Sequence, residues 1–207
     1  MSQTGNSRQI LAAPFSLEQE IKRSRFIAHA CPLSHGEADV TDWLARQHQP
    51  DANHHCWAWQ FNGQYRFSDD GEPAGTAGRP MLMALEGSGI DQCLVIVVRF
   101  FGGTKLGAGG LARAYGGTAA ECLRQAPTRL LRRHRRLRLQ ADFSHSQALF
   151  ELQQQYDSQP TEPHYSSDGL SLDLIVAETA LDEIEASLNN RCRGEVTIRC
   201  EDEQLWR

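Results

Sequence analysis

The sequence has no long hydrophobic run. No stretch of its 207 residues approaches the roughly 20 consecutive apolar residues that a helix needs to cross a bilayer. The segment from Met1 to Ala13 is polar and mixed, and it has no apolar core of the kind found in a secretory signal peptide. We therefore expect a cytoplasmic protein without membrane contact.

The cysteines follow no metal-binding or disulfide pattern. The six cysteines form no CxxC pair and are scattered through segments expected to be strands or helices. This spacing indicates neither a disulfide framework nor a structural zinc site. We expect reduced, mostly buried thiols, no bound metal and no cofactor.

The chain has little net charge, −5, but the charge is unevenly distributed. Residues 1–130 carry 12 Lys and Arg against 12 Asp and Glu, whereas residues 131–207 carry 9 against 14. Five of those nine are clustered at the start of the acidic half, and we call them the arginine band: Arg132, Arg133, Arg135, Arg136 and Arg138.

The most distinctive stretch runs from Cys93 to Gly117. Residues 94–98 form an unbroken apolar run typical of a strand buried on both faces, and a glycine-rich loop then leads into a helix. Glycines and a helix N-terminus let backbone N–H groups converge on a phosphate or carboxylate. The loop matches neither the Walker nor the dinucleotide pattern, and its glycines could instead serve tight turns and close helix packing. The predicted phosphate or carboxylate site comprises Gly102, Gly103, Thr104, Lys105, Gly107, Gly109, Gly110 and Arg113, framed by Arg66, Arg79 and Arg99.

Hydrophobic periodicity predicts the order ββαββαβα for the first half, after a loose lead-in of about a dozen residues. Thr76 is the expected N-cap of the second helix and Gly87 its end. An Asn62–Gly63 hairpin turn should join the third and fourth strands. The expected strands are 15–22, 25–33, 52–61, 65–67 and 94–98, and the expected helices are 36–49, 76–87 and 111–122.

The second half reads as βαββαβ, the ferredoxin-like order. Its strands are expected at 135–143, 160–165, 170–176 and 195–200, and its helices should begin at a Ser144–Gln147 capping box and at Thr179. With the boundary near residue 131, we predict two α+β domains, 1–130 and 131–207.

Three blocks in the first half resemble the YigZ/IMPACT family: ANHHCWAW at 52–59, SDDGEPAGTAGRP at 68–80 and VIVVRFFGGTKLGAGGLARAY at 95–115. The resemblance implies an N-terminal domain like the second domain of ribosomal protein S5. It also implies a C-terminal domain similar to the ferredoxin-like end of elongation factor G. Eukaryotic members regulate translation through an additional N-terminal domain that these blocks do not include, so their partner is not carried over.

Polar residues on the strand at 52–61 and in the following loop suggest a second wall of the site. His54 and Cys56 share one strand face; they could form a nucleophilic pair or bind a metal, or simply make a polar patch. The acidic residues of the loop could bind Mg²⁺, or pair with nearby cations and hold the loop together. The predicted wall comprises His54, Cys56, Asp69, Asp70 and Glu72.

Together these features predict a cytosolic protein that binds RNA or a ribosome-associated partner and modulates translation without catalysis. The arginine band would extend the binding surface, or pair with the acidic half beside it. Two alternatives stay open. The first is a phosphate-handling or hydrolytic enzyme that uses the glycine loop with Asp69 and Asp70, or His54 with Cys56. The second is an interaction module that docks on a translation factor.

Overall fold

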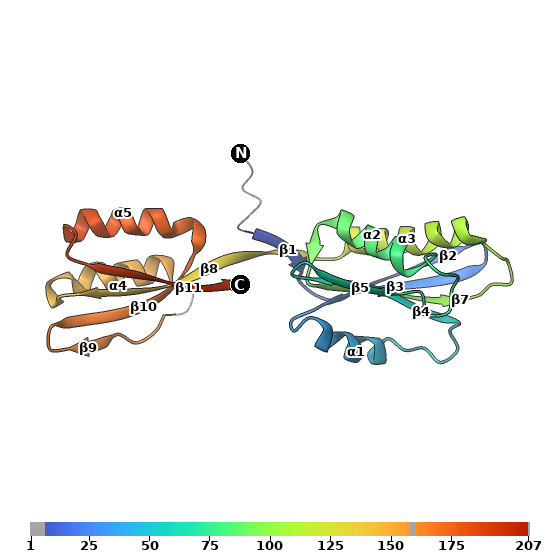
Figure 1. Cartoon of the computed structure of the whole chain (residues 1–207), viewed down its shortest axis with the longest axis horizontal. Coiled ribbons are helices and arrows are strands. Elements are labelled where there is room, and N and C mark those ends of the chain that lie inside the picture. Colours follow the sequence, from blue (N-terminus) through green and yellow to red (C-terminus); the bar gives the residue numbers. More distant parts are fainter. Residues whose placement is uncertain (1–6, 158–159, 207) are drawn as a thin grey trace. The chain divides into compact units, whose positions relative to one another are not determined.

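The computed structural model describes residues 7–157 and 160–206. The chain divides after Leu130 into two compact units, each of which mixes helices and strands (Figure 1). The α+β class expected from the sequence is therefore confirmed. We call the part from Arg8 to Leu130 the N-terminal unit and the part from Leu131 onward the C-terminal unit.

The N-terminal unit contains a five-stranded antiparallel sheet in the order β2-β3-β7-β4-β5. The strands are β2 (Phe15–Ile21), β3 (Ser24–Pro32), β4 (His54–Phe61), β5 (Gln64–Ser68) and β7 (Cys93–Phe100). The central strand β7 is buried at every residue except its last, which explains its continuous apolar sequence. The predicted hairpin at Asn62–Gly63 joins β4 to β5.

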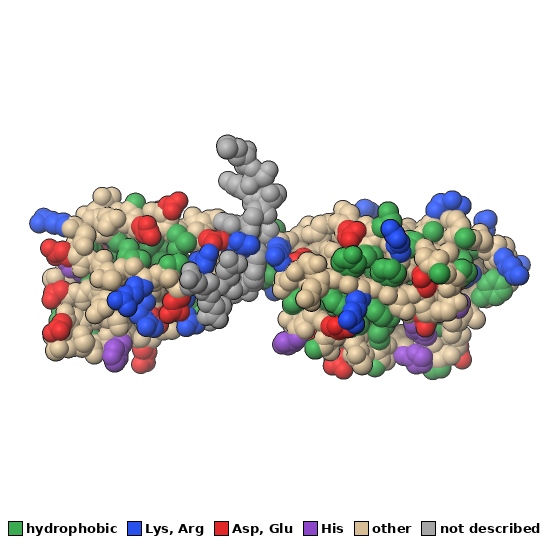
Figure 2. All heavy atoms as spheres, in the orientation of Figure 1, with side chains coloured by type: hydrophobic (Ala, Val, Ile, Leu, Met, Phe, Trp, Pro, Cys, Tyr) green, Lys and Arg blue, Asp and Glu red, His purple; other side chains and the backbone are tan. Residues whose placement is uncertain are grey.

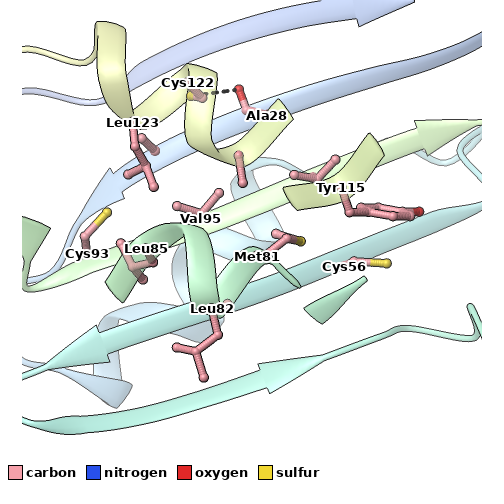
Figure 3. Packing of buried hydrophobic residues seen from close by; sticks show 14 of the residues in the cluster. Ala28, Cys56, Met81, Leu82, Leu85, Cys93, Val95, Tyr115, Cys122 and Leu123 are labelled. Atoms are coloured by element: carbon pink, nitrogen blue, oxygen red, sulfur yellow. Dashed lines mark hydrogen bonds between the residues drawn. The ribbon is translucent and has the colours of Figure 1, made fainter. Parts of the chain in front are cut away.

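Helices cover both faces of this sheet. Helices α2 (Gly78–Ser88) and α3 (Ala108–Gln125) lie on one face, and α1 (Glu37–Arg46) lies on the other (Figure 1). Cys56 packs under α2 and α3, whereas Trp59 packs on the α1 side, as the alternation along the strand predicted. Figure 3 shows Tyr115 of α3 and Met81 of α2 over Cys56 and Val95.

The predicted order ββαββαβα is present, with two additional short strands that the sequence did not predict. The expected loose lead-in contains β1 (Ser7–Leu11), which pairs in parallel with the short β6 (Ile90–Asp91). Ile10 and Leu11 are buried there, and the prediction of a loose segment was wrong for these residues. The strand β1 is stabilised by pairing with a short strand about 80 residues further along the chain. Its own residues therefore carry no local sequence signal that predicts it.

The predicted ends of α2 were also wrong. Helix α2 starts at Gly78 without a side-chain cap from Thr76, whose hydroxyl donates instead to the Pro73 carbonyl. The N–H groups of Ala77 and Gly78 donate to the carboxylate of Asp69, which caps the helix from a preceding loop. At the other end, the left-handed residue is Gly89 and not Gly87.

The C-terminal unit has the predicted βαββαβ order. Its antiparallel strands run β11-β8-β10-β9, the ferredoxin-like arrangement, and α4 and α5 share one buried cluster with them. The strands are β8 (Thr128–Ala141), β9 (His164–Ser166), β10 (Gly169–Ala177) and β11 (Thr197–Trp206), and the helices are α4 (Ser146–Tyr156) and α5 (Leu181–Cys192).

Both predicted caps in this unit were wrong, because a 3₁₀ turn precedes each helix. Ahead of α4, the Asp142 carboxylate accepts from the Ser144 N–H, so Ser144 lies in the turn and is not the N-cap. Thr179 lies within the turn that precedes α5.

Candidate anion-binding pocket

Strand register brings the first site residues together. In the antiparallel pairing of β7 with its two neighbours, Arg99 lies opposite Phe26 of β3 and opposite His54 of β4. All three residues lie on the face of the sheet covered by α2 and α3. Side chains alternate between the two faces of a strand, and each of the three lies on the same face as those residues of its strand that are buried under these helices. The sheet therefore aligns an aromatic ring, a guanidinium and an imidazole in one row.

Arg99 forms a buried ion pair with Glu72 from the loop that precedes α2. The side chains are 6% and 4% exposed, so both charges have left water and depend on each other. The Tyr115 hydroxyl donates to the same carboxylate at 2.7 Å, and burial raises the pKa of this phenol far above its ordinary range. The Arg99 Nε is buried without a hydrogen-bond partner among the described residues.

His54 has a fixed orientation. Its Nδ1 lies 2.7 Å from the Asp70 carbonyl oxygen, which can only accept, so Nδ1 carries a proton. Nε2 then faces the ion pair, 3.8 Å from the Glu72 carboxylate. The imidazole is held by the backbone and presents its second nitrogen to the pocket described below.

The other acidic residues of this loop hold the backbone in place. The Asp69 carboxylate accepts from the N–H groups of Gly75, Ala77 and Gly78 at 2.8 to 2.9 Å, and the Asp70 carboxylate accepts from the His55 N–H at 2.6 Å. Partial burial opposes ionisation of Asp69, but these backbone donors outweigh it and lower its pKa.

Cys56 lies beneath this loop as a neutral thiol. It is fully buried, and its Sγ lies 3.0 Å from the Asp69 carbonyl oxygen. Burial raises its pKa to about 12, so the thiolate needed for nucleophilic attack does not form near neutral pH. The geometry therefore does not favour the alternative in which His54 activates Cys56.

The glycine loop is shaped by one close approach and one unusual conformation. A Cβ on Gly102 would lie 1.7 Å from the Arg23 carbonyl oxygen, so only glycine fits against the β2–β3 turn. Gly107 precedes α3 with φ 69° and ψ 165°, a combination open almost only to glycine. The first helical hydrogen bond runs from the Leu111 N–H to the Gly107 carbonyl, so the N–H groups of residues 108–110 have no partner within the helix.

These parts enclose a pocket of about 430 Å³. It is lined by Asn53, His54, Glu72, Pro73, Arg99, Phe101, Lys105, Leu106, Gly107, Ala108 and Leu111. Because Glu72 and Arg99 neutralise each other, the charge left over comes from Lys105 and the positive end of α3. The pocket therefore suits an anion with an apolar part.

Two of the three predicted framing residues, Arg66 and Arg79, lie outside the pocket lining, and so does the predicted site residue Arg113. Arg66 on β5 donates to Glu37 of α1 at the exposed surface. Arg79 and Arg113 are exposed on α2 and α3. Of the predicted loop residues, Lys105 and Gly107 line the pocket, whereas Gly102, Gly103, Thr104, Gly109 and Gly110 lie beside it in the chain.

The arginine band lies along β8 and is largely paired within the C-terminal unit. Arg138 makes a two-point contact with Asp173 at 2.7 and 2.8 Å, and Arg135 donates to Glu178. On the visible face of this unit, Arg side chains lie next to Asp and Glu side chains (Figure 2). Arg133 and Arg136 also lie within 4 Å of a carboxylate, and Arg132 is exposed.

Sequence reasoning did not identify Asn53 and Phe101, which line the pocket, or Tyr115, which holds one of the lining residues. The Asn53 side chain accepts from the Phe101 N–H at 2.7 Å and fixes the start of the glycine loop. Phe101 is 47% exposed and lines the pocket, and the buried Tyr115 of α3 donates from its hydroxyl to Glu72. An exposed aromatic residue next to a glycine loop is the signal that could have identified Phe101.

The rest of the described chain adds two observations. None of its helices is long and apolar enough to cross a membrane. In the same residues, no group of three or more His, Cys, Asp or Glu side chains is arranged to hold a metal ion.

The fold defines a two-unit α+β protein with a candidate anion-binding pocket next to the central strand of its N-terminal sheet. Residues 22–123 match the family model described as "Impact N-terminal domain". Together with the relatives described next, this match shows that the chain belongs to the YigZ/IMPACT family.

Several curated relatives are similar to this chain. An IMPACT family member of Haemophilus influenzae is 35% identical over 191 residues, 88% of this chain and 91% of the relative. YigZ of Escherichia coli is 49% identical over 127 residues, 58% of this chain and 61% of YigZ. A Thermus thermophilus member is 54% identical over 107 residues, 52% of this chain and 59% of the relative. The chain thus spans about three-fifths of the length of these last two.

A solved structure described as a hypothetical protein has a TM-score of 0.65 and 37% sequence identity. The match covers 96% of this chain and 99% of that one.

Proposed function

We propose that this chain is a non-catalytic cytoplasmic regulator of translation that binds RNA, free or on the ribosome, through the pocket at the start of α3. Family membership is consistent with this proposal, but its main support comes from the pocket. Lys105 and backbone N–H groups at the start of α3 that make no hydrogen bond within the helix lie at the same cavity. Such a combination favours a phosphate.

The buried groups of the pocket support this proposal. The Arg99–Glu72 pair leaves no net negative charge to repel a phosphate, and the unpartnered Arg99 Nε supplies a further donor in a site of low dielectric. Pairing within the C-terminal unit already engages most of the arginine band. The arginine band therefore extends the RNA-binding surface only where an RNA phosphate replaces the carboxylate that pairs with an arginine.

The structure gives the enzyme alternatives less support. Asp69 uses both carboxylate oxygens to accept from backbone N–H groups, which leaves it poorly suited to Mg²⁺. Cys56 is a neutral thiol. The third possibility, docking on a translation factor, shares the surface of the RNA proposal and would show as a complex that survives nuclease treatment.

A filter-binding titration across a salt series tests the proposal. Replacing Lys105, Arg113, Arg136 and Arg138 together by Ala should lower the affinity for single-stranded RNA and flatten its salt dependence. The log–log slope should fall by about 0.7 for each phosphate that the variant no longer neutralises. The control variant Arg46→Ala removes a charge from α1, on the other face of the sheet. Unchanged affinity of the fourfold variant for RNA and ribosomes would contradict the proposal.

A further inference from the structure

We infer that the pocket holds a complete nucleotide unit, with the phosphate at the start of α3 and the base stacked on Phe101. This inference rests on the proposed function, because it concerns the same pocket and names what enters it. The pocket volume of about 430 Å³ lies within the range of small-molecule sites. A phosphate alone would leave much of that space unfilled.

The first argument is the character of the lining away from the charges. Pro73, Leu106 and Leu111 give this part of the pocket an apolar surface. A phosphate gains nothing from such a surface, whereas a nucleobase buries its faces against it. The lining thus combines a polar end with an apolar part, as a nucleotide requires.

The second argument is the position of Phe101. Phe101 lines the pocket and is 47% exposed. Asn53 anchors its backbone at 2.7 Å, and the Arg99 guanidinium carbon lies 5.5 Å from the ring centroid. The ring is therefore held in place from one side while much of its surface stays open for stacking.

The third argument is an unused donor on one of the lining residues. Arg99 lines the pocket and is 5% exposed, and its buried Nε has no partner among the described residues. A buried donor without an acceptor is costly and rare in folded proteins. A ligand acceptor, such as a base carbonyl or ring nitrogen, would satisfy it.

Isothermal titration calorimetry on the full chain tests the inference with adenosine 5′-monophosphate and ribose 5-phosphate. Both probes carry the phosphate, but only the first has a base to stack. We expect the nucleotide to bind about tenfold more tightly, in line with the free energy of one base–aromatic stack. Equal affinities for the two probes, or binding of neither, would overturn the inference.

Variants separate stacking from support of the loop. Phe101→Ala should lower the affinity for adenosine 5′-monophosphate by several-fold more than the affinity for ribose 5-phosphate, whereas Phe101→Tyr should keep the preference for the nucleotide. Phe67 is also exposed but lies outside the pocket lining, so the control variant Phe67→Ala should not change the affinity for either probe. An equal loss for both probes in Phe101→Ala would contradict a stacking role.

The outcomes also distinguish this inference from the proposed function. If the salt-series titration shows RNA binding that depends on Lys105 but the two probes bind equally, the RNA proposal stands and the stacking inference fails. If the nucleotide is preferred but RNA does not bind, the pocket is a mononucleotide site and the RNA proposal fails.

Discussion

At the scale of single residues, the Arg99–Glu72 pair decides whether the pocket stays intact. Replacing Glu72 by Gln leaves a buried guanidinium without its counter-charge, and we expect a loss of about 3 to 5 kcal/mol in the free energy of unfolding. Glu37→Gln, which breaks an exposed pair with Arg66, should cost at most about 1 kcal/mol. Urea unfolding measured by tryptophan fluorescence compares the two variants, and equal losses would contradict the burial argument.

Asp69 makes a second prediction at this scale, because its pKa is lowered in the fold. A carboxylate with a depressed folded pKa stabilises the protein above its unfolded pKa, and this contribution is lost as the pH falls through the folded value. Asp69→Asn, which keeps one acceptor oxygen, should cost about 1 to 3 kcal/mol at neutral pH.

That difference between wild type and Asp69→Asn should shrink below about pH 4, near the ordinary pKa of an aspartate. Unfolding free energies measured across a pH series check this, with the exposed Asp51→Asn as control. A difference that persists unchanged in acid would rule out the hydrogen-bonded carboxylate as its source.

At the scale of elements, α3 allows a matched test of its glycines. Gly107→Ala forces alanine into a conformation open almost only to glycine and should destabilise the protein by about 1 to 3 kcal/mol. Gly117 lies inside α3 and is exposed, and apart from its own helix no atom lies within 4 Å of an added Cβ, so Gly117→Ala should stabilise the protein by about 0.5 to 1 kcal/mol. Thermal unfolding of both variants should show shifts of opposite sign, and shifts of the same sign would refute this account.

Elements with a strong local period could be predicted from the sequence, whereas their ends could not. The strand at 94–98 and the apolar stripe of α3 carry their pattern within a few residues. The cap of α2 comes instead from Asp69, well before Gly78 in the chain, and β1 depends on a partner near residue 90. These contacts form only when segments distant in the chain meet in the fold. The local preference for threonine at helix N-caps therefore indicated Thr76 in place of Asp69.

The candidate site was predictable in part for the same reason. The glycine loop and its lysine are local features, and pairing of the acidic loop with Arg99 was one of the alternatives that the sequence left open. Which carboxylate would pair could not be known, because Glu72 is selected by the register that places Arg99 opposite His54 and by the Tyr115 hydroxyl. Local spacing does not contain that information.

At the scale of the whole molecule, the two units should contribute unequally to RNA binding. Lys105 has no carboxylate within salt-bridge distance among the described residues, whereas Arg138 is held by Asp173. Arg138 must break its ion pair with Asp173 before it can bind a phosphate, and this reduces its contribution to RNA binding. Arg138→Ala should therefore change RNA affinity less than Lys105→Ala does. Parallel filter-binding titrations at low salt measure both changes, and a larger effect from Arg138 would move the main contact to the C-terminal unit.

The most direct test of the central claim is a ¹⁵N–¹H NMR titration of the full chain with a short single-stranded RNA. The account predicts that the amide signals of residues 105–111 shift most, because the N–H groups at the start of α3 receive the phosphate. It also predicts that Lys105→Ala weakens these shifts while the other amide signals keep their positions. Shifts confined to β8 and β10, or no shifts at all, would contradict it.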